Sequence, residues 1–266
     1  MAGQILAERL GWPIERVSVI AGDTRHVPGG WITAGSRSAV HVGSATSVAA
    51  SAARGMLLER AGDVLEAAPA DLVLADGAVS VRGLPSRSVS VTDLLRDEPL
   101  EVVRSWKTET GTSWEPSCQT ADVAVDPETG AVSVRRYVVV HDSGREINPR
   151  IIEGQLQGGI VHGIGYALLE EVRYDDEATL RTPTFLDYTL ASAPEVAFVP
   201  DLVSQESLTG FNPEHVKGVG EAGTIPAPAA ILSAIESALR TRYPALQLDE
   251  LPVTPQRLWA AIARCR

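Results

Sequence analysis

The spacing of hydrophobic and polar residues predicts helices and strands in alternation along the chain. Apolar side chains recur at helical intervals in residues 3–11, and Gly11 then ends the predicted helix. Residues 16–21 alternate between polar and apolar side chains, which predicts a strand. The alanine-rich stretch 43–67 predicts a long helix that ends before Pro69.

Two pairs of short apolar runs predict β-hairpins. The first pair is joined by Asp76-Gly77, the dipeptide that favours a tight type I′ turn. The second pair is joined through Pro127 to Gly130, another turn-forming stretch. The four predicted strands are residues 72–74, 79–81, 120–125 and 132–141.

Further helical patterns complete the expected fold. They cover residues 90–96 with Thr92 as a cap, 151–172, 227–243 and 255–262. Strands and helices do not follow a regular βαβ order, so the fold class is expected to be α+β, with mixed sheets and packed helices. The polar stretch 97–118 suggests two subdomains, residues 1–105 and 106–266.

Composition narrows the classes of function. The 266 residues carry 23 Lys and Arg against 34 Asp and Glu, a formal charge of −11, which disfavours nucleic acid as a partner. The two cysteines are too few for a disulfide scaffold or for an iron–sulfur cluster held by this chain alone. No run of about 18 apolar residues predicts a membrane span.

The segment 217–225 contains a G-x-G-x-x-G pattern with Glu221 inside it. A dinucleotide site requires an apolar strand before the pattern, and residues 211–215 are not one. Glu221 would also repel a pyrophosphate. Two interpretations therefore remain: a flexible loop with a solvated carboxylate, or a carboxylate enclosed by glycines beside a cofactor as a general base.

Three other segments carry candidate chemistry. Residues 33–38 combine small side chains, hydroxyls and Arg37, which suits a phosphate, although this pattern taken alone favours a surface turn with a solvated Arg37. The predicted helix that contains residues 154–165 has five glycines, and each destabilises a helix relative to alanine, so close packing of a backbone or a ligand is expected to offset them. His162 in this helix is more typical of a packed or exposed residue than of a metal ligand. Residues 141–149 predict a structured connection rather than a catalytic triad.

Taken in order, these segments resemble one family, the molybdenum hydroxylases, which include xanthine dehydrogenase, aldehyde oxidoreductase and carbon monoxide dehydrogenase. The resemblance is to the C-terminal, molybdopterin-binding part of the large subunit and covers almost the whole chain. The matching segments are residues 4–11, 22–24, 35–38, 126–130, 141–149, 153–155, 158–159, 211–213, 217–223 and 250–255.

The resemblance implies a role for each candidate residue. Glu221 corresponds to the general base beside the molybdenum, and the metal itself is held by the pterin dithiolene rather than by protein ligands. Residues implied to bind the cofactor, in its cytosine dinucleotide form, are Thr33, Ala34, Gly35, Ser36, Arg37, Gln155, Lys217 and Gly220. The implied reaction is water-derived hydroxylation of an aldehyde or N-heterocycle, or oxidation of carbon monoxide.

The resemblance also implies partners, because the family's large subunits are much longer. We expect a chain truncated at its N-terminus that needs the complementary N-terminal half, [2Fe–2S] and FAD subunits, assembly as a dimer of heteromers and a cytoplasmic location. The alternative is an inactive fragment that acts only as a folding or interaction module. Neither a membrane nor a nucleic acid is expected as a partner.

Overall fold

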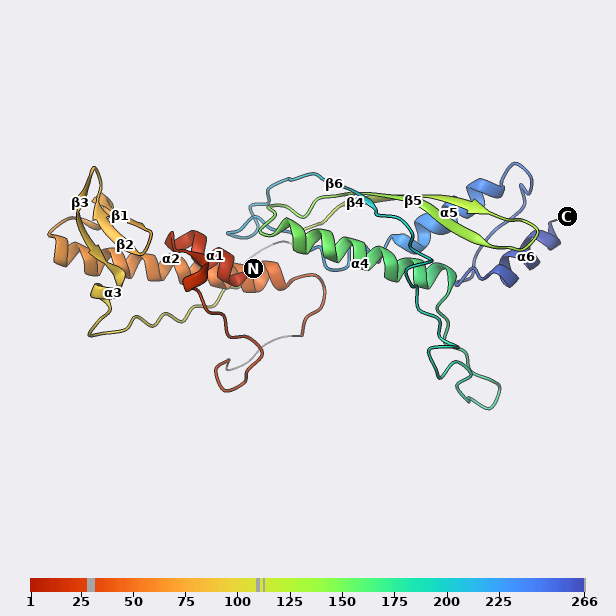
Figure 1. The fold of residues 1–266 in the computed structure, drawn as a ribbon, viewed down its shortest axis with the longest axis horizontal. Coiled ribbons are helices and arrows are strands. Elements are labelled where there is room, and N and C mark those ends of the chain that lie inside the picture. The colour runs from red at the N-terminus through yellow and green to blue at the C-terminus, as the bar shows by residue number, and fades with distance from the viewer. Residues whose placement is uncertain (28–31, 109–110, 112, 266) are drawn as a thin grey trace. The chain divides into compact units, whose positions relative to one another are not determined.

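The computed structural model describes residues 1–27, 32–108, 111 and 113–265. The chain folds as two compact units. Unit 1 comprises Met1–Ser113 and Leu208–Lys217, and unit 2 comprises Trp114–Ser207 and Gly218–Arg266. Each unit combines helices with a three-stranded sheet (Figure 1), so the expected α+β class is confirmed. The division into subdomains after residue 105 stays a prediction.

Unit 1 packs one long helix against a shorter helix and a small sheet. Its elements are α1 (Ala2–Leu10), α2 (Ser38–Leu65), β1 (Leu72–Ala75), β2 (Ala78–Val81), β3 (Leu84–Ser90) and α3 (Val91–Leu94). The three strands are antiparallel in the order β1-β2-β3. Asp76 and Gly77 both have positive φ, 51° and 76°, as a type I′ turn requires, so the first predicted hairpin is confirmed.

Two sequence-based expectations in unit 1 are wrong. Residues 16–21 form no strand, because the alternating run finds no partner strand and leaves Val19 and Ile20 more than half exposed. The N-cap of α3 is Ser90 rather than Thr92, since the Ser90 hydroxyl accepts from the Asp93 amide at 3.0 Å. The polar strand β3 was not expected at all.

The segment 208–217 returns to unit 1 and is tied to α1 by an ion pair. Arg9 donates from Nε and Nη2 to Glu214 Oε1 at 3.0 and 2.7 Å, and also to the Pro213 carbonyl at 3.1 Å. The Glu214 side chain is 1% exposed. Asn212 closes the turn by accepting from the amides of Glu214 and Val216. This segment leads directly into the loop that carries Glu221.

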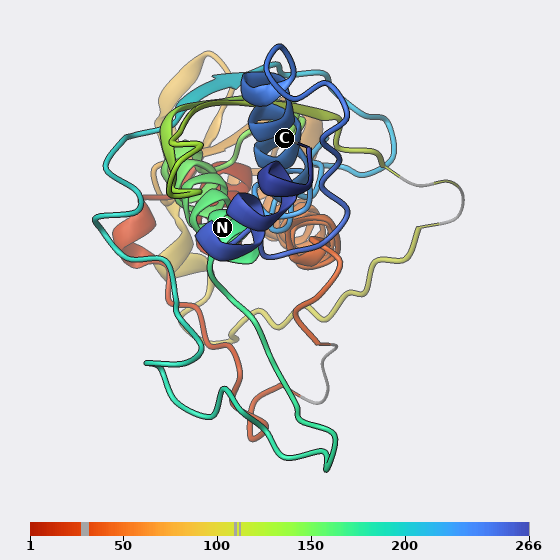
Figure 2. The ribbon, with the colours of Figure 1, turned by 90° about the vertical axis from the view of Figure 1, so that its right-hand side faces the viewer.

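Unit 2 places two helices against a sheet. Its elements are β4 (Ser117–Val125), β5 (Val132–His141), α4 (Pro149–Leu168), β6 (Asp201–Ser204), α5 (Ala227–Leu239) and α6 (Pro255–Arg264). The β4–β5 hairpin is antiparallel, as expected, and β6 pairs with β5 in parallel. Helix α5 packs against β4, and α4 packs against α5 (Figures 1 and 2). The largest buried side chains are Tyr137, Leu156, Ile160, Ile164, Ile231, Ile235, Leu258 and Ile262.

The helix boundaries in unit 2 differ from the expected ones for local reasons. Helix α4 begins at Pro149 because the Asn148 side chain accepts from the Ile151 amide, and it ends at Leu168 rather than 172. Helix α5 ends at Leu239 rather than 243. The short strand β6 lies within the proline-containing stretch 175–216, where no strand was predicted. Among the described helices, none has both the length and the apolar character to cross a membrane.

Candidate functional site

The glycines of α4 allow its backbone to touch the loop that carries Glu221. A Cβ placed on Gly159 would lie 2.9 Å from both the Gly223 Cα and the Thr224 nitrogen. A Cβ on Gly163 would lie 2.3 Å from the Ala227 Cβ at the start of α5. Contacts this short exclude a larger residue. Close packing of another backbone, one of the two expected reasons for these glycines, is therefore present.

Glu221 lies in the turn formed by residues 220–224 and its side chain is exposed. The carbonyl of Glu221 accepts from the amides of Thr224 and Ile225, both at 3.1 Å. The backbone of the turn is thus held, while residue Glu221 remains exposed. Gly223 serves close approach, because a Cβ there would lie 2.5 Å from the Leu156 carbonyl oxygen.

The structure brings two of the candidate cofactor residues to this turn. Gly220 is part of the turn itself, and Gln155 is exposed on α4 directly before Leu156, the residue whose carbonyl touches Gly223. Lys217 ends the 208–217 segment of unit 1 and is partly buried. Glu221, Gly220 and Gln155 therefore share one region of unit 2.

The loop 33–37 borders a cavity of 480 Å³ in unit 1. Gly35 and Ser36 are consecutive residues with positive φ, 66° and 52°, which makes the loop a tight left-handed turn. Arg37 immediately precedes α2, whose first turn has no acidic residue and no side-chain cap. The residues that line the cavity are Ile32, Thr33, Arg37, Ser38, His41 and Val42. Arg37 can only donate, and the Thr33 and Ser38 hydroxyls can donate, which suits an anion such as a phosphate.

The connection 141–149 is structured, as the sequence predicted, and Asp142 orders it. Its carboxylate accepts from the Gly144 amide at 2.9 Å, from the Ser207 amide at 3.2 Å and from the Ser207 hydroxyl. His141 is 4% exposed, and this burial lowers its pKa, an effect that the nearby Glu146 and Asp142 carboxylates oppose. These residues stabilise the chain entering α4 and form no triad.

His162 is exposed on α4 and its ring lies against Tyr166, with 4.2 Å between ring centroids. Among the residues that the structure describes, no group of three or more His, Cys, Asp or Glu side chains is placed to hold a metal ion.

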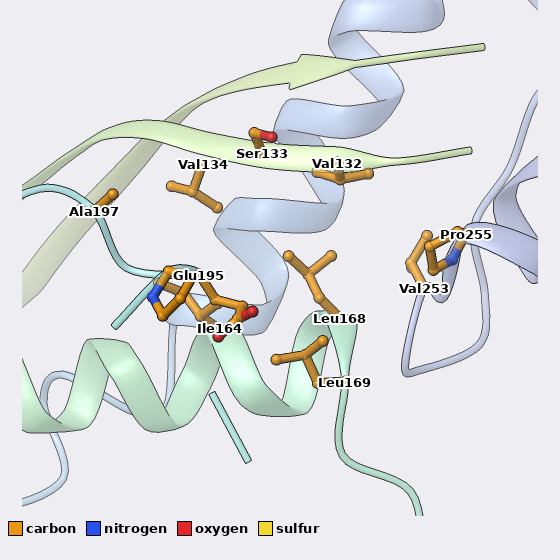
Figure 3. A pocket seen from close by; sticks show the side chains of 11 residues that line it. Val132, Ser133, Val134, Ile164, Leu168, Leu169, Glu195, Ala197, Val253 and Pro255 are labelled. Carbon is orange, nitrogen blue, oxygen red and sulfur yellow. The ribbon is translucent and has the colours of Figure 1, made fainter. Parts of the chain in front are cut away.

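A second cavity, of 390 Å³, lies in unit 2 away from the candidate residues (Figure 3). Side chains from the start of β5, including Val132 and Val134, face Leu168 and Leu169 at the end of α4 across it. Its lining is mostly apolar and contains none of the residues predicted to bind the cofactor. The cavity therefore adds nothing to the candidate site.

Sequence reasoning missed the anchors of the site because they depend on long-range contacts. Glu214 pairs with Arg9 across 205 positions of the chain, and Gln119 reaches the Ala222 carbonyl across 103 positions. Neither residue belongs to a motif with a local spacing rule. For Glu214 the available signal was its place just before the glycine-rich segment 217–223, and Gln119 has no such signal nearby.

Comparisons with known proteins identify the family of this chain. Residues 1–197 match the family model described as "Molybdopterin cofactor-binding domain". The chain is 37% identical to the nicotine 6-hydroxylase large subunit of Paenarthrobacter nicotinovorans, over 96% of this chain and 32% of that protein. It therefore spans about a third of the length of the curated relatives that it matches.

Solved structures give the same result. The crystal structure of quinoline 2-oxidoreductase from Pseudomonas putida 86 superposes with a TM-score of 0.85 at 33% identity, covering 100% of this chain and 35% of that one. Reconstituted CO dehydrogenase from Oligotropha carboxidovorans superposes with a TM-score of 0.90 at 27% identity, covering 99% and 34%. The chain thus belongs to the molybdopterin cofactor-binding domain family of molybdenum hydroxylase large subunits.

Proposed function

We propose that this chain supplies the catalytic base and part of the cofactor cleft of a molybdenum hydroxylase. The observation that carries the proposal is Glu221, an exposed carboxylate on a turn whose backbone is packed directly against α4. A base needs a defined position more than it needs burial in the isolated chain. The carboxylate oxygens of Glu221 would accept the proton released when a hydroxyl oxygen attacks the substrate carbon.

The residues of the loop 33–37 fit the cofactor's phosphates. Arg37, the hydroxyls of Thr33 and Ser38 and the start of α2 all offer donors around one cavity. On unit 2, the exposed amide of Gln155 would orient the molybdenum end of the cofactor. When bound, the molybdenum cofactor supplies the two-electron redox centre at which water-derived oxygen reaches the substrate. We propose the cytosine dinucleotide form, which lengthens the ligand and adds a second phosphate.

We propose an electron-poor N-heterocycle as the substrate class, in preference to an aldehyde or carbon monoxide. The support is the printed names of two relatives, nicotine 6-hydroxylase at 37% identity and quinoline 2-oxidoreductase at 33%. Both names specify a nitrogen heterocycle. An adjacent ring nitrogen withdraws electrons from the carbon that is attacked, which matches a mechanism in which Glu221 assists a nucleophilic oxygen.

Completing the site would require residues from the remaining two thirds of the length seen in relatives. Glu221 and the lining of the 33–37 cavity are open to solvent, whereas a proton transfer is more effective where bulk water is excluded. We propose that a complementary part of the large subunit covers them. Electrons would leave to [2Fe–2S] and FAD centres on partners, in an assembly that is a dimer of heteromers.

Cofactor analysis tests this proposal. The chain purified alone is expected to hold little molybdenum and pterin, and the chain assembled with the complementary part is expected to hold both. Arg37→Gln should lower cofactor retention in the assembly, because it removes a bidentate phosphate donor. Arg25→Gln, on an exposed pair with Asp23, serves as the matched control and should leave retention unchanged.

Two results would contradict the proposal. A full complement of cofactor with turnover in the chain alone would show that no complementary part is needed. An assembly that never holds molybdenum would favour the alternative of an inactive folding or interaction module.

A further inference from the structure

The carbonyl that directly follows Glu221 is held by a side chain from the sheet. Gln119, on β4, donates from Nε2 to the Ala222 carbonyl oxygen at 2.7 Å and makes a longer contact of 3.5 Å with the Gly223 carbonyl. Ala222 is 7% exposed, so little solvent reaches this backbone group as an alternative partner. A buried carbonyl left without a donor costs free energy, so this bond favours one position of the turn.

The Gln119 amide is itself oriented by Tyr137. The Tyr137 hydroxyl donates to Gln119 Oε1 at 2.6 Å. Position 119 pairs with Val139 and position 121 pairs with Tyr137, so the two side chains are diagonal neighbours on one face of the β4–β5 hairpin. Tyr137 is fully buried, and burial raises the pKa of its phenol, which therefore keeps its proton and remains a donor.

The pattern of donors and acceptors leaves one arrangement for this amide. The Ala222 carbonyl can only accept, so the NH₂ group of Gln119 must face it. The amide oxygen must then face Tyr137, which supplies the O–H. A rotation of the amide by 180° would place two acceptors together at Ala222 and break that hydrogen bond.

Helix α4 holds the same turn from another direction. The Thr224 hydroxyl donates to the Gly159 carbonyl at 2.9 Å, and the Gly159 and Gly223 backbones are in contact. Residues 222–224 are therefore fixed from both the sheet and the helix, while the side chain of Glu221 remains exposed. This arrangement fixes a backbone and leaves its carboxylate accessible.

We propose that Gln119 and Tyr137 are positioning residues that set the place of Glu221 by fixing the carbonyl that follows it. This inference rests on the proposed role of Glu221 as the base. The Ala222 carbonyl belongs to the peptide unit that follows the one joining Glu221 to Ala222. A shift of this carbonyl moves the Ala222 Cα and, through the intervening peptide unit, the Glu221 Cα from which the carboxylate extends. Displacement of a reacting group by about 1 Å can lower a rate by about 10²-fold, which makes such an anchor functionally relevant.

The first test measures hydrogen–deuterium exchange of the peptide covering residues 219–225 in the full chain. Gln119→Leu removes the donor with little change in volume and should speed exchange of these amides by about tenfold. Tyr137→Phe removes one hydroxyl and should speed it by a smaller factor. Thr120→Val, on the exposed face of the same strand, is the matched control and should leave exchange unchanged.

The second test measures kcat and KM of the molybdenum-loaded assembly at equal cofactor content. Gln119→Leu is expected to lower kcat by about 10- to 100-fold with KM nearly unchanged, because substrate binding does not use this residue. Should Gln119→Leu fail to fold, Tyr137→Phe keeps the prediction testable, since it deletes a single oxygen.

Two outcomes would overturn the inference. Unchanged exchange at residues 219–225 in both variants would show that Gln119 and Tyr137 do not fix the turn. Faster exchange with unchanged kcat would show that the turn's position does not matter to the reaction. Glu221→Gln, measured in parallel, separates the two claims, because full activity of that variant would reject the proposed base whatever the exchange data show.

Discussion

The two units hold their candidate residues in contrasting ways. In unit 2, the Glu221 turn is packed backbone to backbone against α4 at Gly159 and is hydrogen-bonded to β4. In unit 1, the loop 33–37 lies beside exposed apolar side chains, with Ile32 71% and Val42 50% exposed. Unit 2 therefore fixes the turn of the proposed base through internal contacts, whereas the proposed phosphate-binding loop presents a surface suited to contacts from outside the unit.

This difference shows which part of the chemistry needs internal precision. A base acts through a proton transfer whose rate depends on sub-ångström placement, so rigid packing around Glu221 is useful. Phosphate binding by Arg37 and backbone amides depends on charge and tolerates more adjustment. The predictions below test whether each unit relies on the kind of contact assigned to it.

The largest effect is expected from a single methyl group on α4. Gly163→Ala would place a Cβ 2.3 Å from the Ala227 Cβ and should lower the free energy of unfolding of unit 2 by about 3 kcal/mol. Gly158→Ala, on the same helix, meets nothing within 4 Å and should instead stabilise by about 0.5–1 kcal/mol through helix propensity. Urea unfolding of both variants measures the contrast, and equal effects would refute the packing argument.

A smaller effect is expected from the ion pair of unit 1. Arg9→Met removes the two hydrogen bonds that Arg9 donates to Oε1 of the buried Glu214 carboxylate and should cost about 2 kcal/mol of stability. The comparison variant is Arg25→Met, because Arg25 is exposed and its partner Asp23 lies only two positions away, and little change is expected there. An equal shift of the unfolding temperature in the two variants would show that the Arg9–Glu214 pair stabilises the unit no more than a surface pair does.

Local patterns in the sequence predicted most elements but not their anchors. Asp76-Gly77 and the alanine-rich stretch of α2 act through short-range rules, so the hairpin and the long helix were predictable. The run 16–21 has the alternation of a strand, but pairing depends on a second strand that the sequence does not mark. Glu221, Arg37 and Gln155 emerged from ordered motifs. Gln119, Tyr137 and Glu214 act across long separations, which no spacing rule in one sequence reveals.

The smallest effect concerns pH and His141 in unit 2. Burial places the pKa of folded His141 below 6.5, its value in an unfolded chain, so the unfolded state binds the proton more readily. The contribution of neutral His141 to the free energy of unfolding is complete above pH 6.5 and is lost as the pH falls toward the pKa of the folded state. His141→Gln should therefore weaken the loss of stability between pH 7.5 and pH 5.5, whereas His26→Gln, at an exposed site in unit 1, should not. Urea unfolding at both pH values measures this change in the free energy of unfolding. The same pH dependence in His141→Gln as in the wild type would contradict the prediction.

The central claim is that Glu221, held by unit 2, is the base of a molybdenum hydroxylase. Its most direct test is kcat of the molybdenum-loaded assembly carrying Glu221→Gln, compared at equal molybdenum content with wild type and with Glu59→Gln, an exposed site on α2. The amide cannot accept a proton, so we predict a fall of about 10²- to 10⁴-fold for Glu221→Gln and no change for Glu59→Gln. Wild-type turnover by the Glu221→Gln assembly would contradict the account.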